Sequence, residues 1–129
     1  MATRPLLLAL TLAVISWSGC ATTDSVKPRP LPTGVSFQGN WDSTWGKMVL
    51  AQEGGKVHGT FTGYREGAVT GELDGDVFRF IWDQRVPRSH GHGYMQMSPD
   101  GTHLEGRWGY LKSDDDGGRW AADRDTSGW

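Results

Sequence analysis

Short segments of alternating apolar and polar residues fill the chain from residue 37 onward. Turn sequences rich in glycine and aspartate separate these segments at intervals of about 8 to 12 residues, which is typical of an all-β sandwich or barrel. We expect strands at residues 38–44, 47–52, 56–64, 68–73, 77–84, 91–98, 102–110 and 119–124. Eight short antiparallel strands in this order predict an up-and-down meander closed into a small barrel, because closure removes exposed strand edges.

The same alternation predicts which side chains point into the barrel. Phe61 and Trp108 fall on the apolar face of their strands. Glycines lie two positions away from such large residues, which suits the taper of a small barrel. Strands of about six residues enclose little space, so we expect a filled interior. Its expected inward side chains include Phe61, Ile81, Met95 and Trp108.

The N-terminal residues follow a different pattern. Arg4 precedes an apolar run at residues 6–17, which is shorter than the roughly 20 residues that a transmembrane helix needs. Two small residues, Ser18 and Gly19, follow the run directly. A charged start, a short apolar core and small residues at its end predict a secretory signal peptide over residues 1–19.

Cys20, the only cysteine of the chain, comes directly after these small residues. Residues 1–21 resemble a bacterial lipoprotein signal peptide, with Trp17 where that family usually has an aliphatic residue. The resemblance implies cleavage before Cys20, acylation of this residue with chains such as palmitate, and anchoring to the lipid bilayer. Because Ala21 rather than Asp follows the cysteine, it also implies the outer membrane of the cell envelope. The alternative is an ordinary secreted protein whose leader ends near a free thiol.

The residues after the cysteine are polar and contain three prolines up to residue 36. Such a stretch buries too little apolar surface to order itself, and proline favours an extended spacer. The chain is therefore expected to consist of a signal peptide at 1–19, a lipidated cysteine with a disordered tether at 20–36, and one β-barrel domain at 37–129.

Composition narrows the possible classes of function. The formal net charge of −2 and the scattered basic residues argue against nucleic-acid binding. A single cysteine cannot form a disulfide within the chain. The 19 glycines and seven tryptophans suit short aromatic strands joined by tight turns.

The stretch "GNWDSTWGKMVLAQEGGKVHGTFTGY" at residues 39–64 is similar to the opening of the avidin and streptavidin family. The shared features are Gly-x-Trp, a glycine five residues after the Trp, an apolar strand, a hairpin turn and a Gly-Thr-aromatic strand. The resemblance implies a small meander barrel. It does not imply a biotin site, because an unpaired buried polar group costs about 1–3 kcal/mol and the family's polar ligand residues are replaced here. Those positions hold Ser43, Lys47, Phe61 and Gly63.

Two groups of residues were considered as metal ligands. His90 and His92 are two positions apart, so both rings would point to one face of an extended strand. They are the candidates for a metal pair, but two ligands do not make a site, and we expect no metal or other cofactor. Asp114, Asp115 and Asp116 lack the alternating order of a calcium loop and are expected in a solvated turn.

Carboxylates on the expected strands were considered as catalytic groups. Glycoside hydrolysis needs two of them about 5–10 Å apart, and Glu72, Asp83 and Glu105 are the available residues. The nearby Arg79 and Arg107 favour cross-strand ion pairs on a wet face instead. No serine lies in a nucleophile-elbow sequence. We therefore assign no catalytic residue and expect no enzyme, with a weak hydrolase as one alternative.

The tryptophans are the remaining candidates for a site. Trp41, Trp82 and Trp108 are expected in the core, because aromatic rings bury large areas. Trp45, beside a turn, and Trp129, at the end of the chain, are the candidates for ligand binding, since an exposed indole can stack on a sugar or an apolar ligand. The expected function is that of an anchored interaction or structural module for an envelope protein. The alternative is a small-ligand binder of the avidin or lipocalin type.

Overall fold

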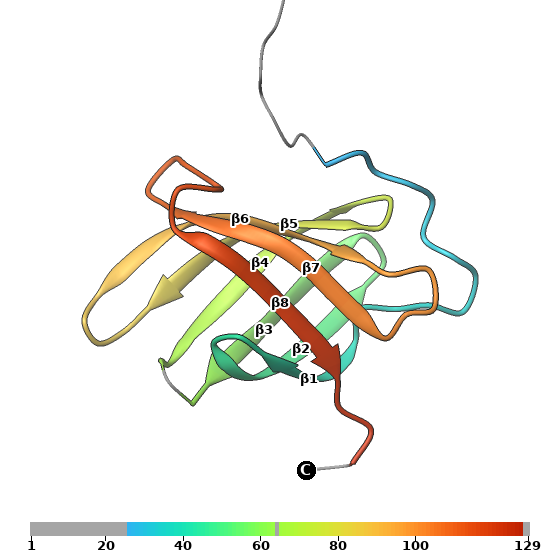
Figure 1. Cartoon of the computed structure of the whole chain (residues 1–129), viewed down its shortest axis with the longest axis horizontal. Coiled ribbons are helices and arrows are strands. Elements are labelled where there is room, and N and C mark those ends of the chain that lie inside the picture. The colour runs from blue at the N-terminus through green and yellow to red at the C-terminus, as the bar shows by residue number, and fades with distance from the viewer. Residues whose placement is uncertain (1–25, 64, 128–129) are drawn as a thin grey trace, which may run out of the picture.

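The computed structural model describes residues 26–63 and 65–127, which form a closed antiparallel β-barrel (Figure 1). Each strand pairs with the next in sequence, and β1 pairs with β8 to close the barrel. The strands are β1 (Gly39–Ser43), β2 (Gly46–Glu53), β3 (Lys56–Thr62), β4 (Gly67–Asp74), β5 (Val77–Gln84), β6 (Ser89–Met97), β7 (His103–Tyr110) and β8 (Gly118–Arg124). The all-β, eight-stranded up-and-down barrel expected from the sequence is confirmed.

The strand bounds follow the expected segments to within a few residues. β5 has the expected bounds, whereas β6 begins two residues earlier than expected. The reason is the pairing of β5 with β6, which continues past Asp83 and His90 to Gln84 and Ser89. The β5–β6 connection is therefore shorter than the loop expected at residues 85–90.

Large apolar side chains fill the barrel. Phe61, Met95 and Trp108 are buried, as expected. The expectation for Ile81 was wrong, because its side chain is 54% exposed on the outer face. Three consecutive apolar residues in β5 leave the alternation ambiguous, and the two larger neighbours, Phe80 and Trp82, take the inward positions.

Glycines make room for the aromatic rings. A Cβ atom on Gly93 would lie 2.5 Å from Cζ of Phe80, and one on Gly67 would lie 2.4 Å from Cζ of Phe61. These distances are too short for any side chain larger than hydrogen, so ring and glycine pack as one unit. The expected alternation of small and large inward residues is present.

Residues 26–38, which we call the strap, run along the barrel and across one of its ends before β1 (Figure 1). Phe37 is fully buried, and Leu31 and Val35 pack against the core. The sequence predicts a disordered tether up to residue 36. Residues 26–36 instead lie on the barrel, because apolar side chains occur between the prolines and pack against its end. Cys20 and Trp129 lie outside the described residues.

Polar contacts hold the strap at two points. Asp76, in the β4–β5 turn, accepts hydrogen bonds from the backbone N (2.9 Å) and Nε (3.0 Å) of Arg29. Arg124, at the end of β8, donates to the carbonyl oxygens of Ser36 (2.6 Å) and Gln38 (2.8 Å). Its guanidinium also lies 4.2 Å from the ring centroid of Trp41. The strap is therefore part of the folded domain.

Candidate functional site

The two ends of the barrel differ. In an up-and-down barrel, the connections after odd-numbered strands lie at one end and those after even-numbered strands at the other. The strap contacts the even-numbered end, since it meets Asp76 in the β4–β5 turn and Gly101 in the β6–β7 turn. The β1–β2, β3–β4, β5–β6 and β7–β8 connections gather at the opposite end (Figure 1).

A cavity of about 150 Å³ lies at this opposite end, and we call it the aromatic cup. The residues that line it are Trp45, Arg65, Trp82, Gln84, Pro87, Ser89, Trp108 and Tyr110. They come from the β1–β2 turn, the β3–β4 and β5–β6 connections, and the ends of β5, β6 and β7. Three indoles and a phenol therefore surround a hollow that also has polar groups on its wall.

The rings of the cup hold one another in place. The ring centroid of Trp108 lies 4.9 Å from that of Trp45, 5.6 Å from that of Trp82 and 4.9 Å from that of Tyr110, each with an edge-to-face arrangement. Edge-to-face pairs add about 0.5–1.5 kcal/mol each beyond their buried area. Trp82 is also fixed by a hydrogen bond from its Nε1 to the carbonyl oxygen of Gly109 (2.9 Å). The cup is thus a preformed aromatic surface.

Polar side chains complete the wall of the cup. Gln84 is buried, and its Nε2 donates to the carbonyl oxygen of Pro87 at 2.7 Å, which holds the β5–β6 connection against the cup. Arg65 adds a guanidinium and Ser89 a hydroxyl to the lining. A few polar groups on a mostly aromatic wall are typical of small-ligand sites.

Exposed apolar side chains occur on the connections at the same end of the barrel as the cup. Val86 is exposed on the β5–β6 connection, Tyr110 at the end of β7 and Leu111 in the β7–β8 connection. Leu111 has a φ of 55°, which is uncommon for a residue other than glycine, asparagine or aspartate. Backbone of this kind costs free energy and is enriched at functional sites.

A smaller cavity of about 10 Å³ lies next to the cup, and its wall includes Trp120 on β8. Trp45, Trp82, Gln84 and Trp108 line both cavities. Phe61 completes the wall of the smaller one. Among the described residues, buried apolar side chains fill the barrel interior beyond this smaller cavity. A ligand therefore has room at the mouth of the barrel and not within it.

The outcome for the expected site residues differs between the tryptophans. Trp45 lines the cup, whereas Trp129 lies outside the described residues. Trp82 and Trp108 are buried, as expected, but they also form the wall of the cup, which the sequence analysis missed. Their positions near the loop end of a strand are the signal that points to this role.

The two histidines considered as a metal pair remain on the outside of β6. His90 is exposed opposite Asp83, and Nδ1 of His92 contacts the carbonyl oxygen of Leu111. Asp116 in the acidic loop accepts a hydrogen bond from the backbone N of Tyr110 at 2.8 Å. Among residues 26–63 and 65–127, no group of three or more His, Cys, Asp or Glu is placed to hold a metal ion.

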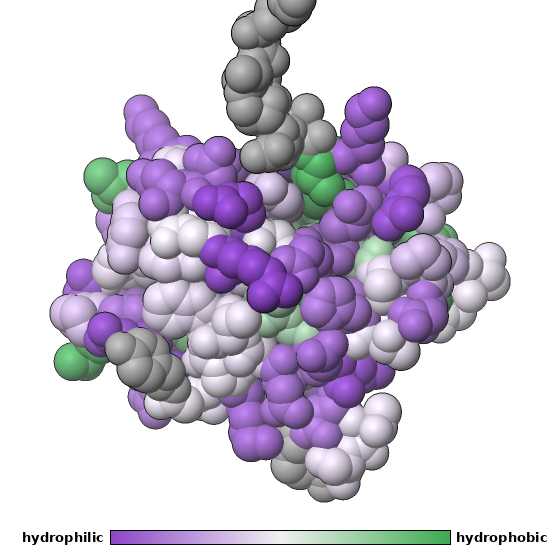
Figure 2. Space-filling model, in the orientation of Figure 1, coloured by the Kyte–Doolittle hydropathy of each residue, from purple (hydrophilic) through white to green (hydrophobic). Residues whose placement is uncertain are grey.

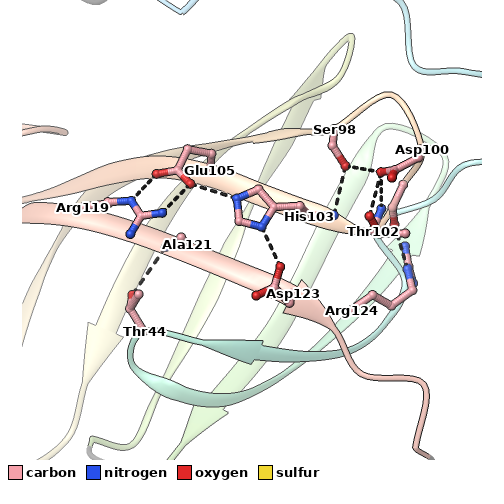
Figure 3. A network of polar contacts seen from close by, with 11 residues as sticks. Thr44, Ser98, Asp100, Thr102, His103, Glu105, Arg119, Ala121, Asp123 and Arg124 are labelled. Carbon is pink, nitrogen blue, oxygen red and sulfur yellow. Dashed lines mark hydrogen bonds and ion pairs between the residues drawn. The ribbon is translucent and has the colours of Figure 1, made fainter.

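Glu105 lies in an outer-face network on β7 and β8 (Figure 3). Its carboxylate accepts from Nε and Nη2 of Arg119, and its Oε2 lies 2.9 Å from Nε2 of His103. The sequence analysis suggested Arg107 as a partner, but Arg119, in the next strand, takes that place. The hydrogen bond from Arg119 lowers the pKa of Glu105, which favours an ion pair over a protonated acid.

The carboxylates considered for hydrolysis lie on the outer surface. Glu72 shares an open hollow of about 440 Å³ with Asp74 and Asp114, while Glu105 lines a separate hollow of about 370 Å³. Glu72 is exposed, and Nε of Arg79 lies 3.9 Å from Asp74. Figure 2 shows that hydrophilic side chains dominate the face of the barrel that it presents.

No protein family, curated protein sequence or solved structure matches the chain. The small meander barrel implied by the resemblance to avidins is present, while the relationship itself stays a prediction. The described residues contain no helix long and apolar enough to cross a membrane.

Proposed function

We propose that this chain is a lipid-anchored envelope protein whose barrel is a non-enzymatic binding module, with the aromatic cup as its ligand site. The observation that carries this proposal is the cup itself, a preformed hollow of about 150 Å³ walled by three indoles and a phenol. A cavity of roughly this volume in another protein holds one benzene molecule. The ligand would therefore offer one ring, such as a sugar ring or an apolar ring.

The position of the strap supports the same proposal. The strap, through which the chain continues toward Cys20, crosses the end of the barrel opposite the cup. The strap begins at Val26 on the flank of the barrel, beside Tyr94 and Arg107 and not among the residues of the cup, so a lipid on Cys20 would leave the cup open to its ligand. The resemblance of residues 1–21 to a lipoprotein signal peptide supports the anchor.

The anchor is tested by labelling cells with a palmitate analogue. We expect label on the wild-type chain and none on Cys20→Ser, because the thioether and the new amino terminus both depend on this residue. Equal labelling of the two chains would remove the anchor from the proposal.

The cup is tested by titrating the full chain in detergent with methyl β-glucoside and with phenol, using calorimetry. We expect one of the two rings to bind. Replacing Tyr110, whose ring is 49% exposed at the cup, by Ala should weaken binding about fivefold, since it removes one ring contact. Val49→Ala, an exposed apolar residue on β2 away from the cup, is the matched control and should change nothing. Unchanged affinity in Tyr110→Ala, or no binding of either probe, would favour a structural module.

A further inference from the structure

We propose that the indole N–H of Trp120 donates a hydrogen bond to the ligand, so that the ligand's ring carries an acceptor at its inner edge. This inference rests on the proposed function of the cup and adds the chemical class of the ring. Sugars and heterocyclic rings share such an acceptor, in the form of a ring oxygen, a ring nitrogen or a ring carbonyl. Hydrocarbon rings lack one.

Trp120 differs from Trp41 and Trp82 in its hydrogen bonding. Its side chain is 2% exposed, and its Nε1 is the one buried side-chain polar atom in residues 26–63 and 65–127 without a hydrogen-bond partner. Nε1 of Trp41 donates to the carbonyl oxygen of Phe37 at 2.9 Å, and Nε1 of Trp82 donates to that of Gly109. Buried polar groups are paired in the great majority of cases, so an unpaired donor on a residue that lines a cavity points to a partner from outside the chain.

The side chains around Trp120 are mostly aromatic. Phe61 and Phe80 pack edge-to-face against it at centroid distances of 5.4 and 5.2 Å, and Trp45 lies at 6.0 Å. Aromatic faces are at best weak acceptors. The packing of Trp120 therefore accounts for its burial but does not provide a strong acceptor for its N–H.

The cavity beside Trp120 links this donor to the cup. At about 10 Å³ it is near the lower limit for one water molecule, and it could equally take one atom at the edge of a ligand ring. The indoles of Trp45 and Trp108 border both cavities and are 4.9 Å apart. Trp82 and Gln84 border both cavities as well, so the two hollows lie side by side, and a ring seated in the cup would turn its inner edge toward the smaller cavity that Trp120 lines.

A site with a buried donor discriminates strongly against a ring that cannot pair with it. Pyridine and benzene are a matched pair for this test, because they have the same size and differ in one acceptor atom. We expect the full chain in detergent, at mildly alkaline pH where pyridine is uncharged, to bind pyridine about tenfold more tightly than benzene. Tetrahydropyran is a saturated ring with one acceptor oxygen. Its affinity compared with that of pyridine distinguishes a sugar-like ligand from an aromatic heterocycle.

The Trp120→Phe variant should lose the preference for pyridine over benzene. Trp41→Phe removes a buried indole at the strap end and is the matched control, which should keep the preference. The indole N–H resonances in a nitrogen–proton NMR spectrum give a second measurement on the wild-type chain. The resonance of Trp120 should move downfield with pyridine and far less with benzene, which serves even if Trp120→Phe fails to fold.

The outcomes separate this proposal from that of the cup. Equal affinity for pyridine and benzene, with equal shifts of the Trp120 resonance, would overturn the role of Trp120 and leave the cup as a ring-binding site. A preference for pyridine that persists in Trp120→Phe would also overturn it. Failure of every ring probe to bind would overturn both proposals.

Discussion

His103 is the central residue of the network on the outer face of β7 and β8 (Figure 3). Its Nδ1 lies 2.7 Å from Oδ1 of Asp123, and its Nε2 lies 2.9 Å from Oε2 of Glu105. These two hydrogen bonds, with the Asp123 contact the stronger cause, raise the pKa of His103 above 6.5. The folded protein therefore favours the imidazolium form of this residue.

This raised pKa predicts a small dependence of stability on pH. The contribution of His103 to the free energy of unfolding is complete below about pH 6.5 and is lost as the pH rises through the folded pKa. Because the side chains are partly exposed, we expect a loss of less than about 1 kcal/mol. Urea unfolding of wild type and His103→Gln, at pH values below and above 6.5, measures this loss in the free energy of unfolding.

In His103→Gln the dependence on pH above about 6.5 should flatten. His58→Gln, a change at an exposed histidine on β3, is the control and should leave the wild-type slope. The same slope in wild type and His103→Gln would contradict the assignment.

At the residue scale, the sequence alone predicts the burial of some side chains but not of others. Phe61 and Met95 are buried where the alternation places them. Phe61 has a threonine on each side, and Gln96 follows Met95. Ile81 could not be assigned by alternation, because both of its neighbours are larger apolar residues. Trp120 was not singled out either, since the lack of a partner for its N–H depends on which rings surround it.

The strap is the element whose behaviour differs most from the sequence-based expectation. Proline content and polarity predict an extended chain, and the chain is extended. Whether an extended chain docks depends on partners far away in sequence, such as Asp76 for Arg29 and Arg124 for Ser36. No local pattern in residues 26–36 encodes those partners.

Asp76 offers a test of how the strap is held. Burial raises the pKa of this carboxyl, but the hydrogen bonds from the Arg29 backbone, Gln96 and the Arg29 side chain outweigh burial and lower it. Asp76→Asn places an amide donor against these donors. We expect the free energy of unfolding to fall by about 1–3 kcal/mol, with faster amide hydrogen exchange in residues 26–36.

Asp74→Asn is the matched control, because Asp74 is exposed and its ion pair with Arg79, at 3.9 Å, is a surface pair. It should change the stability by less than about 1 kcal/mol and leave exchange in the strap unaltered. Strap exchange that is the same in Asp76→Asn and wild type would show that apolar packing and the Arg124 hydrogen bonds hold the strap without Asp76.

At the scale of the whole molecule, the barrel was predictable because each sequence pattern that specifies it is local. Turn sequences set the strand ends, alternation sets the inward face, and consecutive hairpins set the order. The cup was less predictable, since it needs Trp45, Trp82 and Trp108 to meet from three places in the sequence. Their meeting follows from closure of the barrel, which brings the connections after odd-numbered strands together.

Docking of the strap also sets how far the barrel would reach from a membrane with a lipid on Cys20. Residues 26–38 belong to the folded domain, so only residues 21–25 separate Cys20 from the flank of the barrel where Val26 lies beside Tyr94 and Arg107. A fully extended chain spans at most about 3.5 Å per residue, so residues 21–25 can span at most roughly 20 Å. With a lipid on Cys20, the cup would sample only molecules close to the bilayer surface, at a high local concentration.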